Sequence, residues 1–150
     1  MKKFSFALER VLEFRKLRME EEQLRLEQCL ARLQSIDLLE RELQRQKFEA
    51  DQDLREREAA QSIVAVEEAS AFTAYRGYHR RAAAQLAGRR AEALHQIARQ
   101  RGALLEARRN HEILRRSREQ ALREWKTEFN LEQESLAGEL YLARWKPARC

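Results

Sequence analysis

Residues that end or bend secondary structure are scarce in this chain. Its 150 residues include four glycines and one proline, and aromatic residues make up 7%. Sandwiches, barrels and doubly wound sheets need frequent turns, so we do not expect any of them here. Five strong helix formers (Ala, Arg, Glu, Leu and Lys) supply 95 of the 150 residues, above the share of about half that is typical of coiled coils and long helices. The composition predicts an all-α protein.

Motifs for catalysis, cofactors and metals are also missing. The glycines have neither the spacing of a P-loop nor that of a dinucleotide-binding loop, and the three histidines, sixteen residues apart, form no zinc-binding pair. The carboxylates of Glu20, Glu21 and Glu22 are expected to form a solvated face rather than a catalytic pair. We therefore expect no catalytic residue, no cofactor, no metal and no enzymatic activity.

Signals for export or membrane insertion are lacking as well. No apolar run approaches the roughly 20 residues that a membrane-spanning helix needs, and Glu9 and Arg10 end the apolar start of the chain before a signal sequence forms. Cys29 and Cys150 lie far apart and suggest no disulfide framework. These features predict a cytoplasmic protein.

Apolar residues recur every seven positions along two long segments, which is the pattern of coiled-coil helices. The first helix is predicted at about residues 4–60, where Glu40 and Lys47 interrupt the pattern, and the second at about 66–145, ending before Pro147. The first segment contributes Leu12, Met19, Leu26, Leu33 and Leu54 with Cys29, Ile36, Leu43 and Ala50, and the second contributes Phe72, His79, Leu86, Ala93, Ala107, Leu114 and Ala121 with Ala83, Ile97, Leu104, His111 and Trp125.

A turn at about residues 61–65 would fold the two segments into a single antiparallel coiled-coil hairpin that covers residues 1–150. The residue numbers of facing positions then sum to about 125, which places Leu33 near Ala93 and leaves the chain from Trp125 onward without a partner. One unbroken helix is the rival geometry. Three glycines within the second segment are expected to allow close approach of the helices: Gly77, Gly88 and Gly102.

Positive charge is concentrated in the second segment. The net charge of the chain is +5, and residues 76–123 contain 13 arginines and four glutamates. A basic balance raises the possibility of nucleic-acid binding, but the arginine pairs lie inside the heptad pattern and no base-reading residues are interleaved with them. A solvated face or pairing within the hairpin explains the arginines better, followed by binding to an acidic protein surface. We expect no nucleic-acid partner.

An aromatic cluster and an apolar tail are expected to bind partners. The cluster contains Phe72, Tyr75 and Tyr78, and the two tyrosines cannot both point into one two-helix seam. His79 is expected either within the seam or in contact with a partner. The tail from Trp125 onward is apolar enough that we expect it to dock on another surface.

Residues 4–15, FSFALERVLEFR, resemble the start of flagellar FliJ proteins, and the likeness in length and helix pattern covers nearly the whole chain. The resemblance implies an antiparallel coiled coil that acts as the central stalk of the type III export ATPase. Such a protein lies in the cytoplasm, peripheral at the inner face of the cell membrane. The implied partners are the export ATPase hexamer, the cytoplasmic domain of the export gate and export chaperones.

Two sets of residues are candidates for these contacts. The resemblance points to the early second helix for the export gate, and we call these residues the aromatic set: Phe72, Tyr75, His79, Ala82 and Leu86. The free end of the hairpin carries the residues that we expect to meet the ATPase ring, and we call them the arginine set: Arg10, Arg15, Arg115, Arg116, Arg118, Arg123 and Trp125. A self-associating structural coiled coil is the alternative function.

Overall fold

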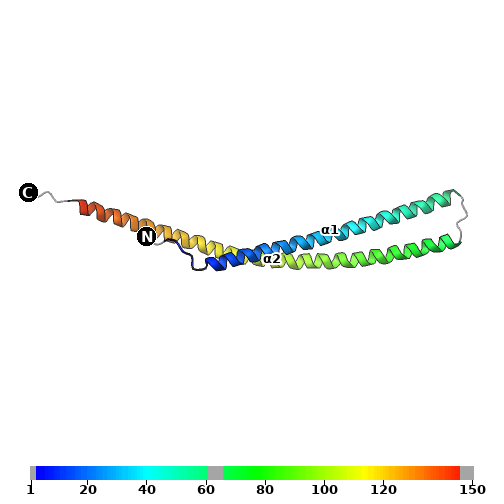
Figure 1. Ribbon diagram of the computed structural model, residues 1–150, viewed down its shortest axis with the longest axis horizontal. Helices are drawn as coiled ribbons and strands as arrows, with labels where there is room; N and C mark the ends of the chain where they lie inside the picture. Colours follow the sequence, from blue (N-terminus) through cyan, green and yellow to red (C-terminus); the bar gives the residue numbers. More distant parts are fainter. Residues whose placement is uncertain (1–2, 61–65, 146–150) are drawn as a thin grey trace, which may run out of the picture. The chain divides into compact units, whose positions relative to one another are not determined.

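The computed structural model describes residues 3–60 and 66–145 of the chain, and these residues form two long helices (Figure 1). Helix α1 spans Glu9–Ala59 and helix α2 spans Val66–Arg144. The described residues contain no strand, and the two helices contact each other, which confirms the predicted all-α helical hairpin. The turn expected at residues 61–65 lies outside the described residues.

Three of the four helix ends agree with the prediction, but α1 begins later than expected. The helix was predicted from about residue 4 and starts at Glu9, where the backbone N–H of Glu9 donates to the carbonyl of Phe6 at 3.1 Å. A glutamate in the first turn suits the positive end of the helix dipole. The preceding residues are not helical, and among them the ring of Phe4 packs against Trp125 of α2.

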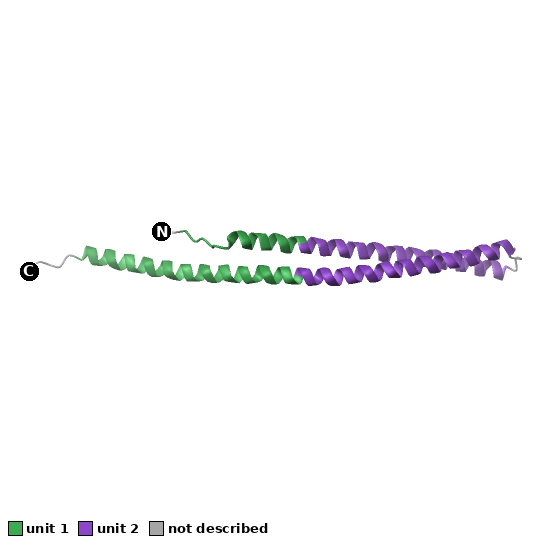
Figure 2. Ribbon diagram, turned by 90° about the horizontal axis from the view of Figure 1, so that it is seen from below, with its two compact units in different colours: residues 1–21, 105–150 green, residues 22–104 purple. Residues whose placement is uncertain are grey.

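The contacts within the chain form two units (Figure 2), and each unit contains part of both helices. Unit 2 covers residues 22–104, with α1 and α2 side by side and antiparallel. Unit 1 covers residues 1–21 and 105–150, in which the start of α1 lies beside α2. The described part of α2 within unit 1 continues past the start of α1 as a single helix, which we call the tail (residues 126–145).

The seam of unit 2 is built from the predicted heptad residues. Ile36, Ala93 and Ile97 are buried, and the other described members of the series are at least half-buried with two exceptions. Ala83 is exposed while its neighbour Ala82 is half-buried, and Lys47 is exposed at its interrupted position. Two amphipathic helices can bury only a narrow apolar stripe on each helix, and their other faces remain in contact with solvent.

Polar contacts across unit 2 fix which residues face each other. Arg32 donates to the side chain of Gln96 at 3.2 Å, and Arg90 donates to Asp37 at 2.9 Å. Their residue numbers sum to about 125, as predicted for the hairpin register. The agreement confirms the antiparallel pairing within this unit.

A buried polar pair interrupts the apolar seam of unit 2. Glu22 is 5% exposed, and the side-chain amide of Gln100 donates to both its carboxylate and its backbone carbonyl. Arg25 donates to the same carboxylate from the next turn. The expectation that Glu22 belongs to a solvated face is therefore wrong. Glu22 stands seven residues before Cys29 and Gln100 seven after Ala93, so both occupy heptad positions that face the partner helix.

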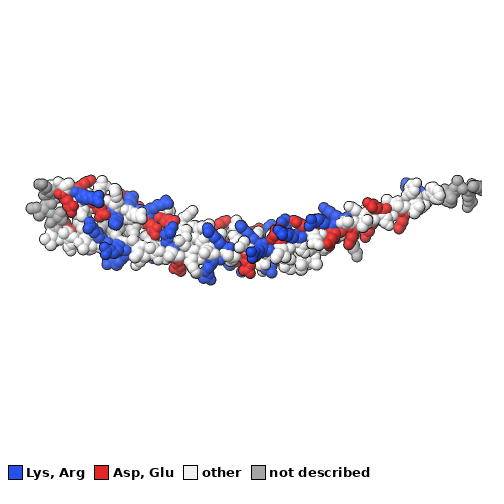
Figure 3. Space-filling model, turned by 180° about the vertical axis from the view of Figure 1, so that it is seen from behind, with Lys and Arg blue, Asp and Glu red and all other residues white. Residues whose placement is uncertain are grey.

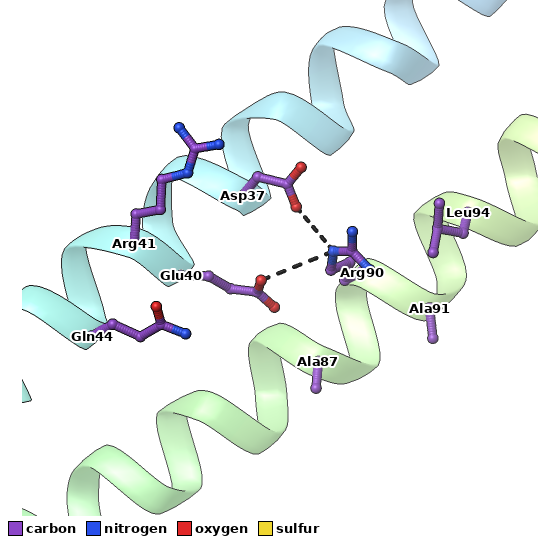
Figure 4. Close-up of a pocket in the computed structure, with 8 residues that line it drawn as sticks. All are labelled: Asp37, Glu40, Arg41, Gln44, Ala87, Arg90, Ala91 and Leu94. Atoms are coloured by element: carbon purple, nitrogen blue, oxygen red, sulfur yellow. Dashed lines mark hydrogen bonds and ion pairs between the residues drawn. The ribbon is translucent and has the colours of Figure 1, made fainter.

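A second polar layer lies where Glu40 interrupts the heptad pattern (Figure 4). The guanidinium of Arg90 on α2 bonds to Asp37 at 2.9 Å and lies 3.9 Å from Glu40. Arg90 lies seven residues before Ile97 and therefore occupies a heptad position of α2. The polar residues that interrupt the apolar stripes of the two helices thus face each other. A groove of about 550 Å³ runs beside this layer and is lined by Asp37, Glu40, Arg41, Gln44, Ala87, Arg90, Ala91 and Leu94.

The glycines of α2 do not serve close helix approach. A methyl group built on Gly88 or Gly102 would have no neighbour within 4 Å, and one built on Gly77 would meet only the end of the Arg81 side chain at 3.9 Å. The expectation of tight packing at these glycines is therefore wrong. Each lowers helix stability by about 1 kcal/mol relative to alanine.

We predict that Gln100→Leu lowers the free energy of unfolding by about 1–3 kcal/mol, because the buried Glu22 loses the two hydrogen bonds that Gln100 donates. Adding Glu22→Leu should recover most of this loss, since an apolar pair leaves no buried group unsatisfied. Urea unfolding followed by circular dichroism measures both changes. Gln96→Leu is the matched control at an exposed interhelical contact and should change stability by less than about 0.5 kcal/mol. A double variant no more stable than Gln100→Leu would contradict this role.

Candidate functional site

The five residues of the aromatic set all lie on α2 within unit 2, and they differ in how much surface they offer. Phe72, Tyr75, Ala82 and Leu86 are half-buried, whereas His79 is only 4% exposed. The set therefore forms one edge of the hairpin seam rather than a fully exposed patch. A partner that binds here would touch the half-buried members and reach His79 only at its margin.

His79 occupies the seam, one of the two positions that the sequence allowed. The edges of two tyrosine rings pack on it, Tyr75 at 4.3 Å and Tyr78 at 5.6 Å between ring centroids. Neither ring nitrogen of His79 has a hydrogen-bond partner among the described residues. Burying an unpaired polar group disfavours folding by about 1–3 kcal/mol. The aromatic contacts around His79 therefore have to offset this penalty.

The two tyrosines of the cluster have different roles. The hydroxyl of Tyr75 donates across the seam to the backbone carbonyl of Gln46 at 3.4 Å, so Tyr75 reaches α1. Tyr78 is 56% exposed. As expected, the two rings do not both enter the seam. Tyr75 contributes to the pairing of the helices. Tyr78, which is not part of the aromatic set, exposes more of its ring than Tyr75, which is.

A groove beside the aromatic set carries an excess of positive charge. Lys47 and Arg80 line it, and Arg76 lies 3.8 Å from Asp51 across its floor. No group of three or more His, Cys, Asp or Glu side chains among the described residues could hold a metal ion. No helix in the described part of the chain has an apolar stretch long enough to cross a membrane. The groove offers charged and aromatic contacts at the surface.

Two members of the arginine set are held by glutamates on their own helix. Arg115 bonds to Glu112 at 2.8 Å and also to Glu119, and Arg116 bonds to Glu112 at 2.9 Å. The hydrogen bond from Arg115, followed by that from Arg116, lowers the pKa of Glu112 to about 2, and Glu112 in turn raises the pKa of Arg115. Both arginines are therefore engaged in ion pairs with carboxylates of α2.

Arg118 and Trp125 form a different cluster with the start of the chain. Arg118 donates to both carboxylate oxygens of Glu9, at 2.8 and 3.1 Å, and its guanidinium lies 5.7 Å from the ring centroid of Phe4. The Phe4 ring meets Trp125 at 6.0 Å. The expectation that the chain has no partner from Trp125 onward is therefore wrong for Trp125 itself. Of the remaining members of the arginine set, Arg10 and Arg123 are exposed and Arg15 is half-buried.

The tail presents apolar and acidic side chains to solvent. Its exposed apolar residues include Leu131, Leu136, Leu140, Tyr141 and Leu142, which are 51–72% exposed. Acidic side chains gather along the tail (Figure 3), and they come from Glu128, Glu132, Glu134 and Glu139.

The residues missed by sequence reasoning are Glu22, Gln100 and Phe4. The first two could have been found by asking which residues occupy the heptad positions that no apolar residue fills. Phe4 was expected inside α1, but it lies before the helix and contacts Trp125 and Arg118 of α2. No local motif encodes a contact between residues so far apart in sequence.

We predict that the carboxyl of Glu112 titrates at about pH 2 instead of near its ordinary value of 4.5. Stability from its ion pairs is then present above pH 4.5 and is lost as the pH falls through about 2. The carboxyl carbon shift in a nuclear magnetic resonance titration measures this pKa. Arg115→Ala should raise it most and Arg116→Ala less. A Glu112 that titrates normally in the unsubstituted protein would disprove the pairing in solution.

Comparison with known proteins leaves the family of the chain open. No family model, curated protein or solved structure matches it. The resemblance of residues 4–15 to flagellar FliJ proteins is thus a hypothesis that depends on those residues and on the helix pattern. The function it implies requires its own test.

Proposed function

We propose that this protein is a non-enzymatic central stalk of the flagellar type III protein export ATPase. The observation that carries the proposal is the unequal hairpin, in which α1 of 51 residues pairs with α2 of 79 residues and leaves an exposed tail. A stalk of this family needs a paired shaft and an end that enters the ATPase ring. The FliJ-like residues 4–15 stand at that same end of the hairpin.

The arginine set would meet the ring. A shaft inside a six-fold ring cannot match six identical subunits at once, so its contacts should be few, polar and adjustable. Long arginine side chains provide such contacts because they combine charge with flexible apolar stems. Binding would favour closure of the ring around the shaft and so raise ATPase activity through assembly, without chemistry performed by this chain.

The aromatic set would meet the cytoplasmic domain of the export gate, so the protein would couple the ring to the gate and assist export chaperones. It would work in the cytoplasm, peripheral at the inner face of the cell membrane. The charged groove lined by Lys47 and Arg80 beside the set supports a protein partner with acidic groups.

A self-associating structural coiled coil is the second candidate. The exposed leucines of the tail favour it, since Leu136 is 51% and Leu140 64% exposed and a second copy could cover them. The two functions differ in what covers the tail, a ring of another protein or a second molecule of this one. Light scattering of the purified protein separates them.

We predict that the protein has no ATPase activity of its own and stimulates the cognate export ATPase. Stimulation should be largest at low enzyme concentration, where ring assembly limits the rate. It should decrease with added salt, because the charges are exposed and are screened beyond about 10 Å at 0.1 M salt. Phosphate release at several enzyme concentrations measures the effect.

Removal of residues 125–150 and the double change Arg115→Glu with Arg116→Glu should each reduce the stimulation. Arg41→Glu and Arg81→Glu together, in unit 2, make a matched charge control that should leave it unchanged. If the full-length protein alters neither oligomerisation nor turnover of that ATPase, the stalk function is wrong, and the self-associating coiled coil replaces it.

We also predict that Tyr75→Ala weakens binding to the gate domain by about tenfold, as expected for loss of an aromatic anchor. Tyr75→Phe should bind normally, since it keeps the ring and loses only the long bond to Gln46. Phe48→Ala is the control at an exposed ring outside the aromatic set, since Phe48 is 66% exposed on α1. Calorimetry measures binding, and circular dichroism measures helicity. A loss of helicity that accounts for the loss of binding would make Tyr75 structural only.

A further inference from the structure

Residues 3–8, which we call the N-terminal strap, precede α1 as a non-helical segment that ends in a turn, and Phe4 of this segment contacts α2. Along the strap, Phe4 and Phe6 are half-buried, whereas Lys3, Ser5 and Ala7 are exposed. Such alternation is typical of an extended segment with one face on the protein. The strap therefore packs as a separate element and does not simply fray from the end of α1.

Side-chain contacts hold the strap in place. The Phe4 ring meets Trp125 edge to face at 6.0 Å, with an interplanar angle of 61°. The guanidinium of Arg118 covers the Phe4 ring at 5.7 Å and is itself fixed by Glu9, the first residue of α1. The backbone hydrogen bonds outside helices in the described residues include none between the strap and α2. Because aromatic rings and one cation attach the strap to α2, the strap can open without breaking a ladder of backbone hydrogen bonds.

The surface under the strap is the beginning of an apolar row that continues along the tail. Trp125 stacks on Phe129 at 5.2 Å, and both are half-buried. Leu136 and Leu140 follow on the same side of the helix by their spacing, and they are 51% and 64% exposed. The strap thus contacts Trp125, the first residue of the row, and leaves the aliphatic end of the row open.

We propose that the N-terminal strap is a reversible cover over Trp125, and that a partner which binds this row must displace Phe4. The proposal rests on the proposed function in one respect, that the partner is the export ATPase ring. Two members of the arginine set, Arg118 and Trp125, are the residues that hold the strap. The same residues cannot offer their full surfaces to the strap and to the ring together.

Such a cover lowers the apparent affinity for the ring. The ring binds only the fraction of molecules whose strap is open, so the apparent dissociation constant is the intrinsic constant divided by that fraction. An aromatic pair of this kind corresponds to a change of about 2- to 10-fold in the open population. The strap would keep the end of the stalk covered until a ring subunit competes for it.

The first experiment tests the cover without any partner. The chain has two tryptophans, so Trp145→Phe leaves Trp125 as the only one. In that background, Phe4→Ala should shift the emission of Trp125 to longer wavelength and increase its quenching by acrylamide. Phe14→Ala is the matched control, since Phe14 is 61% exposed on α1. Unchanged Trp125 emission and quenching in Phe4→Ala, with helicity intact, would overturn the cover.

The second experiment tests competition with the ring. Phe4→Ala should lower the concentration that gives half-maximal ATPase stimulation by about 2- to 10-fold, and Phe14→Ala should not change it. A higher concentration for Phe4→Ala would overturn the proposal, because the strap would then be part of the docking surface. If the unsubstituted protein does not affect the ATPase, the proposed function fails, and the fluorescence result alone decides whether the strap is a cover.

Discussion

The architecture depends on a seam between two helices, in which polar residues of one helix meet polar residues of the other at two layers. Glu22 meets Gln100, and Arg90 meets Asp37 and Glu40. A shift of one helix by a turn would place these groups against leucine, isoleucine or alanine and leave them unsatisfied. The polar layers therefore select one register among the many that a repetitive apolar stripe would permit.

The seam is narrow, and most side chains lie on the outer faces of the two helices. No large side chain among the described residues is fully buried, and the buried polar residues Glu22 and His79 are 5% and 4% exposed. The arginines, the tyrosine cluster and the acidic tail are distributed along the outer surface.

Heptad spacing was enough to predict the two helices, the antiparallel pairing and most of the seam. The prediction was weaker wherever a residue acts through a distant partner. In the sequence, Glu22 looks like part of an acidic run, and its burial can be predicted only when its heptad position is compared with that of Gln100. Phe4 reads as helical unless Trp125 is known to lie beside it. The heptad position of His79 favoured the seam over a contact with a partner, and its burial between the two tyrosines agrees with the seam.

The open space around Gly88, Gly102 and Gly138 has a consequence for how α2 melts. Glycine is rare inside helices unless a neighbour needs the room, and a Cβ built at any of these three positions would meet no atom within 4 Å apart from the adjoining residues and backbone of its own helix. Each glycine therefore weakens the helix without a packing gain, and local unwinding should begin there rather than uniformly along the chain. Backbone amides near these glycines should exchange with solvent sooner than those beside Ile97 or Ala107. In cooperative terms, α2 is a series of helical segments joined at three weak points, and Gly138 places one of these points within the tail.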